Sequence, residues 1–237
     1  MTVLFLFALG MVSFLTARLS LVIYLHMPAA WLCEAGEAAG EERLLHNRCP
    51  HRVLSVILMT AAVAVLLRVS AGRQLVPASL LQERSVYYLI ACVILLPAAL
   101  SDIDYCIIPD QSCLAACLAG LARGLGSGFS GVADAAAGAL LCGGFMLFSS
   151  LLSRLLSGEE GMGMGDVKLA ASCGSLAGAS GGPDMWSAAA GSVFVCSVLI
   201  SAVWFSILLL LGKVRYGDAR PMGTWIVLST LLVIAAE

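Results

Sequence analysis

Two short acidic motifs interrupt the long apolar stretches of this chain, and they hold the residues best suited to chemistry. The first motif reads Ser101-Asp102-Ile103-Asp104-Tyr105-Cys106-Ile107-Ile108-Pro109-Asp110. The second reads Gly161-Met162-Gly163-Met164-Gly165-Asp166-Val167-Lys168. Placing a carboxylate at or near membrane depth costs free energy, so a carboxylate found there usually has a function. Two carboxylates that share a water can hydrolyse an amide, because the ionised one takes a proton from water and the protonated one polarises the carbonyl. Each of the two motifs therefore offers a carboxylate for such a pair.

Proline and glycine next to the two aspartates indicate how the backbone runs there. Pro109 is expected to end or redirect the chain after the helix that carries Asp102. Gly163 and Gly165 precede Asp166, and glycine permits unusual backbone angles and the close approach of another backbone. This suits an extended peptide that lies beside the site and pairs with it like an added strand.

Three other charged residues of the motifs have open roles. Asp104 is two positions from Asp102 and so points elsewhere on a helix; it either tunes the pair electrostatically or caps a neighbouring element. Asp110 is expected to cap the helix that follows Pro109. Lys168 either places a positive charge near the acids or the substrate, or extends to the membrane interface.

The composition is that of a polytopic membrane protein. Of 237 residues, 60% are hydrophobic and 12% are charged, whereas soluble domains carry about 25% charged residues. The net charge of −2 and the lack of a Lys/Arg cluster exclude an obvious nucleic-acid partner. The nine cysteines include no Cys-x-x-Cys pair, so no metal site is expected.

Apolar stretches long enough to cross or enter a bilayer predict an all-α bundle of about eight transmembrane helices in a single domain, residues 1–237. The candidate spans are 2–26, 53–70, 86–103, 111–127, 133–153, 167–182, 186–211 and 222–236. Two of them, 111–127 and 167–182, are short and rich in small residues, which predicts interior helices. Residues 27–52 form a short polar insert after the first span.

The distribution of Lys and Arg predicts the orientation of the eight spans. The odd-numbered loops would carry Arg43, Arg48, Arg52, Arg154, Lys168, Lys213, Arg215 and Arg220. The opposite side would carry Arg73, Arg84 and Arg123, with Arg68 near a boundary. This asymmetry places the insert and both acidic motifs in the cytoplasm.

The two motifs together resemble the type IV prepilin peptidases, membrane aspartyl proteases of the Gly-x-Gly-Asp class. The resemblance rests on Asp102-x-Asp104…Pro109-Asp110 and on Gly163-Met164-Gly165-Asp166-Val167-Lys168-Leu169. It implies that Asp102 and Asp166 are catalytic. Weaker likenesses are Ser13-Phe14-Leu15 with Val22-Ile23-Tyr24 and Pro28, Arg48-Cys49-Pro50-His51, and Pro221-Met222-Gly223.

The resemblance also implies a substrate and a place of action. Family members remove a short basic leader from prepilins or pseudopilins at the cytoplasmic face of the bacterial inner membrane. Many bacterial members also methylate the new N-terminus with S-adenosylmethionine, and their larger insert carries two Cys-x-x-Cys pairs that bind zinc. Here the insert is short and only Cys49 remains where those pairs would lie, so zinc is not expected. Methylation with S-adenosylmethionine stays open, and no other cofactor is expected.

Two other classes of function compete with the peptidase reading. A transporter could use intramembrane acids as a proton or cation relay, but it would have acids deep in its spans and often inverted repeats. A peptidase-like scaffold of a pilus or secretion system could have lost its activity. The intact pair of aspartates and the intact Gly-x-Gly-Asp argue against that loss.

Overall fold

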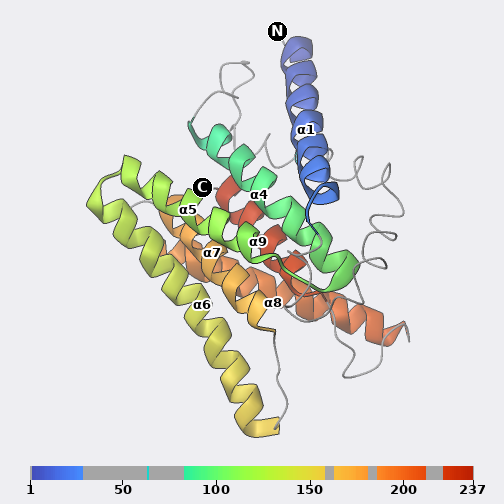
Figure 1. The fold of residues 1–237 in the computed structure, drawn as a ribbon, viewed down its shortest axis with the longest axis vertical. Coiled ribbons are helices and arrows are strands. Elements are labelled where there is room, and N and C mark those ends of the chain that lie inside the picture. The colour runs from blue at the N-terminus through green and yellow to red at the C-terminus, as the bar shows by residue number, and fades with distance from the viewer. Residues whose placement is uncertain are drawn as a thin grey trace.

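The protein is built from α-helices throughout the part of the chain that the computed structural model describes, which is residues 2–28, 63, 83–157, 163–180, 186–211 and 221–236. Figure 1 shows the arrangement of the elements. In chain order they are α1 (Thr2–Leu25), α4 (Glu83–Tyr105), α5 (Asp110–Gly126), α6 (Phe129–Ser157), α7 (Met164–Ser180), α8 (Trp186–Leu210) and α9 (Gly223–Ala236).

The described helices are those of an integral membrane protein. Four segments are long and apolar enough to cross a bilayer, namely Leu6–Leu25, Glu83–Tyr105, Phe129–Leu156 and Ala189–Leu210. The ranges of seven predicted spans coincide with described helices, although α6 begins and ends about four residues outside its prediction. Only four of these helices qualify as spans, so the count of about eight spans stays a prediction. The predicted span 53–70 and nearly all of the insert lie outside the described residues.

Helix α7 is the interior helix of the bundle, as its small residues predicted. It packs against α5, α6, α8 and α9, and Leu169, Cys173, Leu176 and Ala177 are fully buried along it. With 17 residues it is about 26 Å long, shorter than a hydrocarbon core of about 30 Å. The same prediction for α5 is correct on one face only, because Leu114, Leu118 and Leu125 lie exposed on the other.

Backbone-to-backbone packing of glycines joins α7 to α6. A Cβ added at Gly138 would overlap the carbonyl oxygen of Gly174, and one at Gly174 would lie 2.8 Å from the Cβ of Cys142. One turn further along, a Cβ at Gly143 would lie 2.8 Å from that of Ala171. Such close approach is how small residues hold membrane helices together. It fixes the position of the helix that opens with Asp166.

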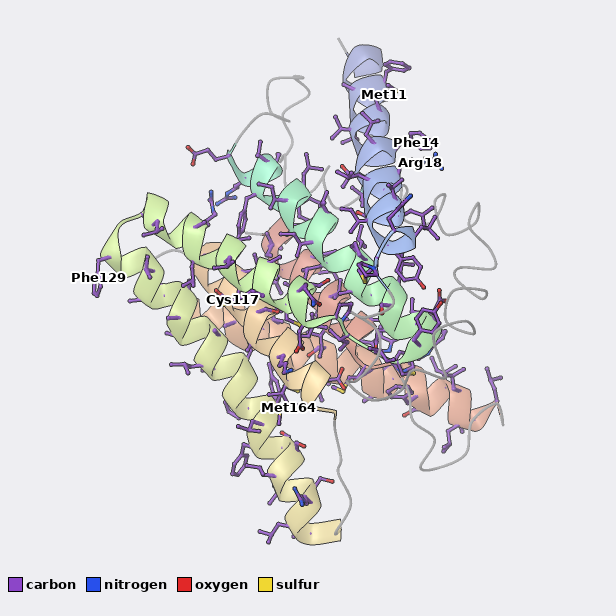
Figure 2. All side chains as sticks on the ribbon, in the orientation of Figure 1. Met11, Phe14, Arg18, Cys117, Phe129 and Met164 are labelled. Carbon is purple, nitrogen blue, oxygen red and sulfur yellow. The ribbon has the colours of Figure 1, made fainter. Side chains whose placement is uncertain are left out.

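Helix α1 stands beside the bundle and packs on α4 (Figure 1). Leu21 and Tyr24 are buried there with Leu100 and Tyr105 partly buried around them. The other face exposes large apolar side chains, and Figure 2 labels Met11 and Phe14 among them. An exposed apolar face of this kind suits a helix that faces lipid.

We expect Gly138→Ala to lower the apparent melting temperature in detergent, because the new methyl group would push α6 and α7 apart. Overpacking of this kind costs about 1–3 kcal/mol. Gly144→Ala is the matched control in the same helix, because a Cβ there meets nothing within 4 Å and alanine favours the helix. Equal melting temperatures for the two variants would contradict the packing argument.

Candidate active site

The first acidic motif forms the end of α4 and a tight reversal of the chain. Cys106 has φ 55° and its N–H donates to the carbonyl oxygen of Asp102 at 2.8 Å. This left-handed residue terminates the helix in the way that glycine usually does. The hydroxyl of Ser101 donates to the carbonyl oxygen of Ile107 at 2.6 Å, so the chain after Cys106 folds back toward Asp102. Pro109 then starts the next helix, as its N-cap residue with extended backbone angles.

Asp102 is buried against the start of α9. Its side chain is 3% exposed, and its Oδ2 accepts a hydrogen bond from the backbone N–H of Thr224 at 2.8 Å. The Thr224 hydroxyl lies 3.1 Å from the same oxygen, and the N–H of Gly223 adds a second main-chain donor. The first N–H groups of a helix have no partner within the helix and favour an anion. The carboxylate of Asp102 satisfies two of them.

Asp166 lies in the first turn of α7, outside the four helices that qualify as spans. Its N–H donates to the carbonyl oxygen of Gly163 at 3.1 Å, which closes the turn. Its buried Oδ1 accepts no hydrogen bond. Burial first, and then the negative charge of Asp102, raises the pKa of Asp166 to about 7. The negative charge of Asp102 therefore acts on the carboxyl group of Asp166, as it would in a pair that shares a proton.

Gly223 is the point where the parts of the site meet. A Cβ added there would lie 3.1 Å from Oδ2 of Asp102, 3.1 Å from Leu169 and 2.7 Å from the Cδ1 of Ile108. Leu169 belongs to α7, one turn after Asp166, and Ile108 belongs to the reversal after α4. Ile108 also lies 3.5 Å from the position that a Cβ of Gly165 would take. The ends of α4, α7 and α9 thus converge around one apolar side chain.

Lys168 and Asp110 link the two acidic motifs at the surface. The Lys168 ammonium group donates to both carboxylate oxygens of Asp110 at 2.9 Å. The expected capping of α5 by Asp110 is not what the structure has. The N-cap residue is Pro109, no side-chain hydrogen bond caps the helix, and Asp110 turns its carboxylate to the cation instead. An exposed ion pair of this kind contributes about 0–1 kcal/mol, so it aligns the two helix starts more than it stabilises them.

Asp104 faces away from the pair and binds α1. The Tyr24 hydroxyl donates to its Oδ2 at 2.5 Å, and Tyr24 is fully buried. This contact joins α4 to a neighbouring helix without capping it, so both roles left open for Asp104 stay predictions. The first motif therefore has one acid for the site and another for the attachment of α1.

The glycines of the second motif act through their small size. Neither Gly163 nor Gly165 has a positive φ; among the described residues Gly128 is the glycine that has one. Gly165 packs on Ile108 at ordinary contact distance, and Gly163 is exposed next to the site. The conformational freedom of glycine in the left-handed region is therefore not used at these two positions. The strand-like binding of a peptide beside them stays a prediction.

Three residues of the site have no role that the sequence predicts, namely Ile108, Gly223 and Thr224. Pro221 and Gly223 were noted only as a weak likeness, although proline and glycine before an apolar run are a signal for the start of a helix. No pattern in the sequence pairs that start with an aspartate 122 positions away. Among the described residues, no three His, Cys, Asp or Glu side chains lie close enough to hold a metal ion.

Comparison with known proteins identifies a family that the chain matches. A model of the type IV leader peptidase family matches residues 89–211, which include both aspartates and end before α9. Proteins named prepilin leader peptidase/N-methyltransferase are similar to this chain: that of Aeromonas hydrophila is 29% identical over 202 residues, and that of Aeromonas salmonicida (strain A449) is 28% identical over 202 residues. Each alignment covers 84% of this chain and 62% of the relative.

A third relative matches over a shorter region. The protein of the same name from Stutzerimonas stutzeri is 31% identical over 137 residues, 57% of this chain and 44% of its own length. The chain therefore spans less than two thirds of the curated relatives that it matches. No solved structure matches it.

We expect Tyr24→Phe to lower the apparent melting temperature, because it removes the hydroxyl that binds Asp104 between α1 and α4. A hydrogen bond to a charged group contributes about 1.5–3 kcal/mol. A double-mutant cycle with Asp104→Asn isolates this contact from the other contacts of both residues. Additive effects of the two substitutions would show that the contact contributes nothing to stability.

Proposed function

The chain belongs to the type IV leader peptidase family, and from this premise we propose that it is a membrane-embedded aspartic endopeptidase with Asp102 and Asp166 as its catalytic pair. Its substrates are prepilins or pseudopilins, from which it removes the short basic leader. The observation that carries the proposal is the convergence of two carboxyl groups, 64 positions apart (166 − 102), at the adjoining ends of α4 and α7. Asp102 is buried there, and Asp166 is partly buried with one oxygen fully covered.

The reaction of such a pair is the hydrolysis of a peptide bond by one water molecule. The ionised acid takes a proton from the water while the oxygen of the water attacks the carbonyl carbon, and the protonated acid donates to the carbonyl oxygen. Collapse of the tetrahedral intermediate breaks the C–N bond, and the nitrogen receives a proton from the pair. The free Oδ1 of Asp166 offers a place for the water or the carbonyl oxygen. Pro109, Gly163, Gly165 and Lys168 support the site around it, and Asp104 attaches α1 to the helix that carries Asp102.

We propose the bacterial inner membrane as the location, with the site at the cytoplasmic face. The excess of Lys and Arg on the loops that carry the two motifs supports this orientation. Asp102, Asp166 and Thr224 lie at one end of the helix bundle, and the Glu83–Arg123 ion pair joins the start of α4 to the last turn of α5 at the other end. The active site would thus lie beside the position where a basic leader emerges from the membrane.

Methyl transfer is a second activity in the names of the relatives. For this chain it is an open addition to the proposal, with S-adenosylmethionine as the methyl donor. The lack of Cys-x-x-Cys pairs sets the chain apart from the zinc-binding pattern. The mass of the cleaved product decides the matter, since methylation adds one CH₂ to the new N-terminus.

We expect Asp102→Asn and Asp166→Asn each to lower kcat/KM for leader cleavage by about a thousandfold or more, because asparagine keeps the size but cannot carry the proton. The measurement is gel shift and mass spectrometry of prepilins incubated with the enzyme in detergent. Asp134→Asn in α6 is the matched control and should cleave normally. Normal cleavage by either catalytic variant would reject the paired-acid mechanism. An intact chain that cleaves none of many prepilins would favour the scaffold or transporter reading.

We expect the cleavage rate to fall as the pH rises above about 7, because the pair then loses the proton that Asp166 holds. The sign follows from a raised carboxyl pKa: the folded protein keeps this proton between about pH 4 and 7, where an unfolded chain would have released it. The same group therefore stabilises the fold most at low pH and loses that contribution as the pH approaches 7. A pH profile of kcat/KM without an alkaline decline near 7 would contradict the assignment.

A further inference from the structure

The two aspartates receive very different numbers of hydrogen bonds. Oδ2 of Asp102 faces the Thr224 N–H at 2.8 Å and the Thr224 hydroxyl at 3.1 Å, and the Gly223 N–H adds to them. Oδ1 of Asp166 is buried and receives no hydrogen bond. Donors favour the ionised form of a carboxyl group, and burial without donors favours the neutral form.

The donors on Asp102 are the first N–H groups of a regular helix. The carbonyl oxygen of Met222 accepts from the N–H groups of Trp225 and Ile226 at 3.0 and 3.2 Å, so α9 turns from Met222 onward. The N–H groups of Gly223 and Thr224 are therefore left without partners in the helix. They point along the helix axis toward Asp102, where the helix dipole also favours negative charge.

The Thr224 hydroxyl has a choice of acceptors and one proton. It lies 3.3 Å from the carbonyl oxygen of Ala99 and 3.1 Å from the carboxylate of Asp102. The carboxylate is closer, and an ionised acceptor forms the stronger hydrogen bond. When Asp102 is neutral, the hydroxyl can return to Ala99 at little cost.

We propose that the N-terminus of α9, acting through Thr224 and the main chain of Gly223, holds Asp102 as the ionised member of the pair and leaves the shared proton on Asp166. This inference rests on the proposed function. Asp102 then takes the proton of the attacking water, and Asp166 donates its proton to the carbonyl oxygen of the substrate. Thr224 is a positioning residue, since it acts through Asp102.

The other titratable groups around the pair do not reproduce this asymmetry. Helix α9 carries none along its whole length. Those on the other described elements near the site are Cys113 and Asp110 of α5, Lys168 of α7, Tyr24 of α1, and Asp104 and Tyr105 of α4. Lys168 is occupied by Asp110, and Asp104 binds Tyr24. The difference between the two acids thus depends on the start of α9.

The test is the pH profile of kcat/KM for leader cleavage by Thr224→Val, which keeps the shape and the main-chain N–H but removes the hydroxyl. Without the hydroxyl, Asp102 takes up a proton more readily, so the acidic limb should move to higher pH by about one unit. Thr224→Ser should restore the original limb. Thr230→Val is the matched control in α9, since the Thr230 hydroxyl donates to Ile226, and it should leave the limb in place.

The outcomes separate this inference from the proposed function. If the intact chain cleaves and the acidic limb of Thr224→Val does not move, the inference is wrong and the peptidase stands. If Thr224→Val shifts the alkaline limb and not the acidic limb, the roles of the two acids are reversed and the inference is also wrong. If the intact chain does not cleave, the proposed function fails, and a double-mutant cycle on melting temperature decides the inference. Thr224→Val and Asp102→Asn should then couple at neutral pH and not at a pH low enough to protonate Asp102.

Discussion

A buried carboxylate in a membrane bundle must either receive hydrogen bonds or keep a proton, and this constraint organises the site. Asp102 meets it through the N-terminus of α9. Asp166, without a donor on its buried oxygen, meets it by holding a proton up to about pH 7. The two solutions are complementary, because hydrolysis by a pair of acids needs one of each kind. In the proposed mechanism, this difference lets one acid take a proton from water while the other donates one.

The bundle holds the two acids in place by different means. Asp166 lies in the first turn of α7, which packs on α6 through glycines that leave no room for a side chain. Asp102 ends α4, which is attached through α9 and through α1 by the Tyr24–Asp104 contact. The apolar side chain of Ile108 fills the space between these parts. The site is therefore assembled from segments that pack separately, and its precision depends on α9, which contacts both α4 and α7.

The sequence predicted the helices well where a single physical signal dominates. Long uncharged runs must be helical in a bilayer, and the small residues of 167–182 predicted the burial of α7 correctly. The prediction failed where two signals compete, as at Asp110, which could cap a helix or bind a cation and does the latter. It could not reach Thr224, because hydrogen bonds between residues far apart in the chain leave no periodic pattern. The family match also ends before α9, so the hydrogen bonds from this helix to Asp102 are known from the structure.

The place of α9 in the chain has a consequence for biogenesis. Polypeptides enter the membrane from the N-terminus onward, and α9 follows every other described helix. While the earlier segments are inserted, Asp102 lacks the donors that Thr224 and Gly223 provide. The nascent chain thus carries both acids yet has an incomplete pair until α9 docks. In the proposed enzyme, the order of synthesis therefore delays proteolytic activity until α9 has docked.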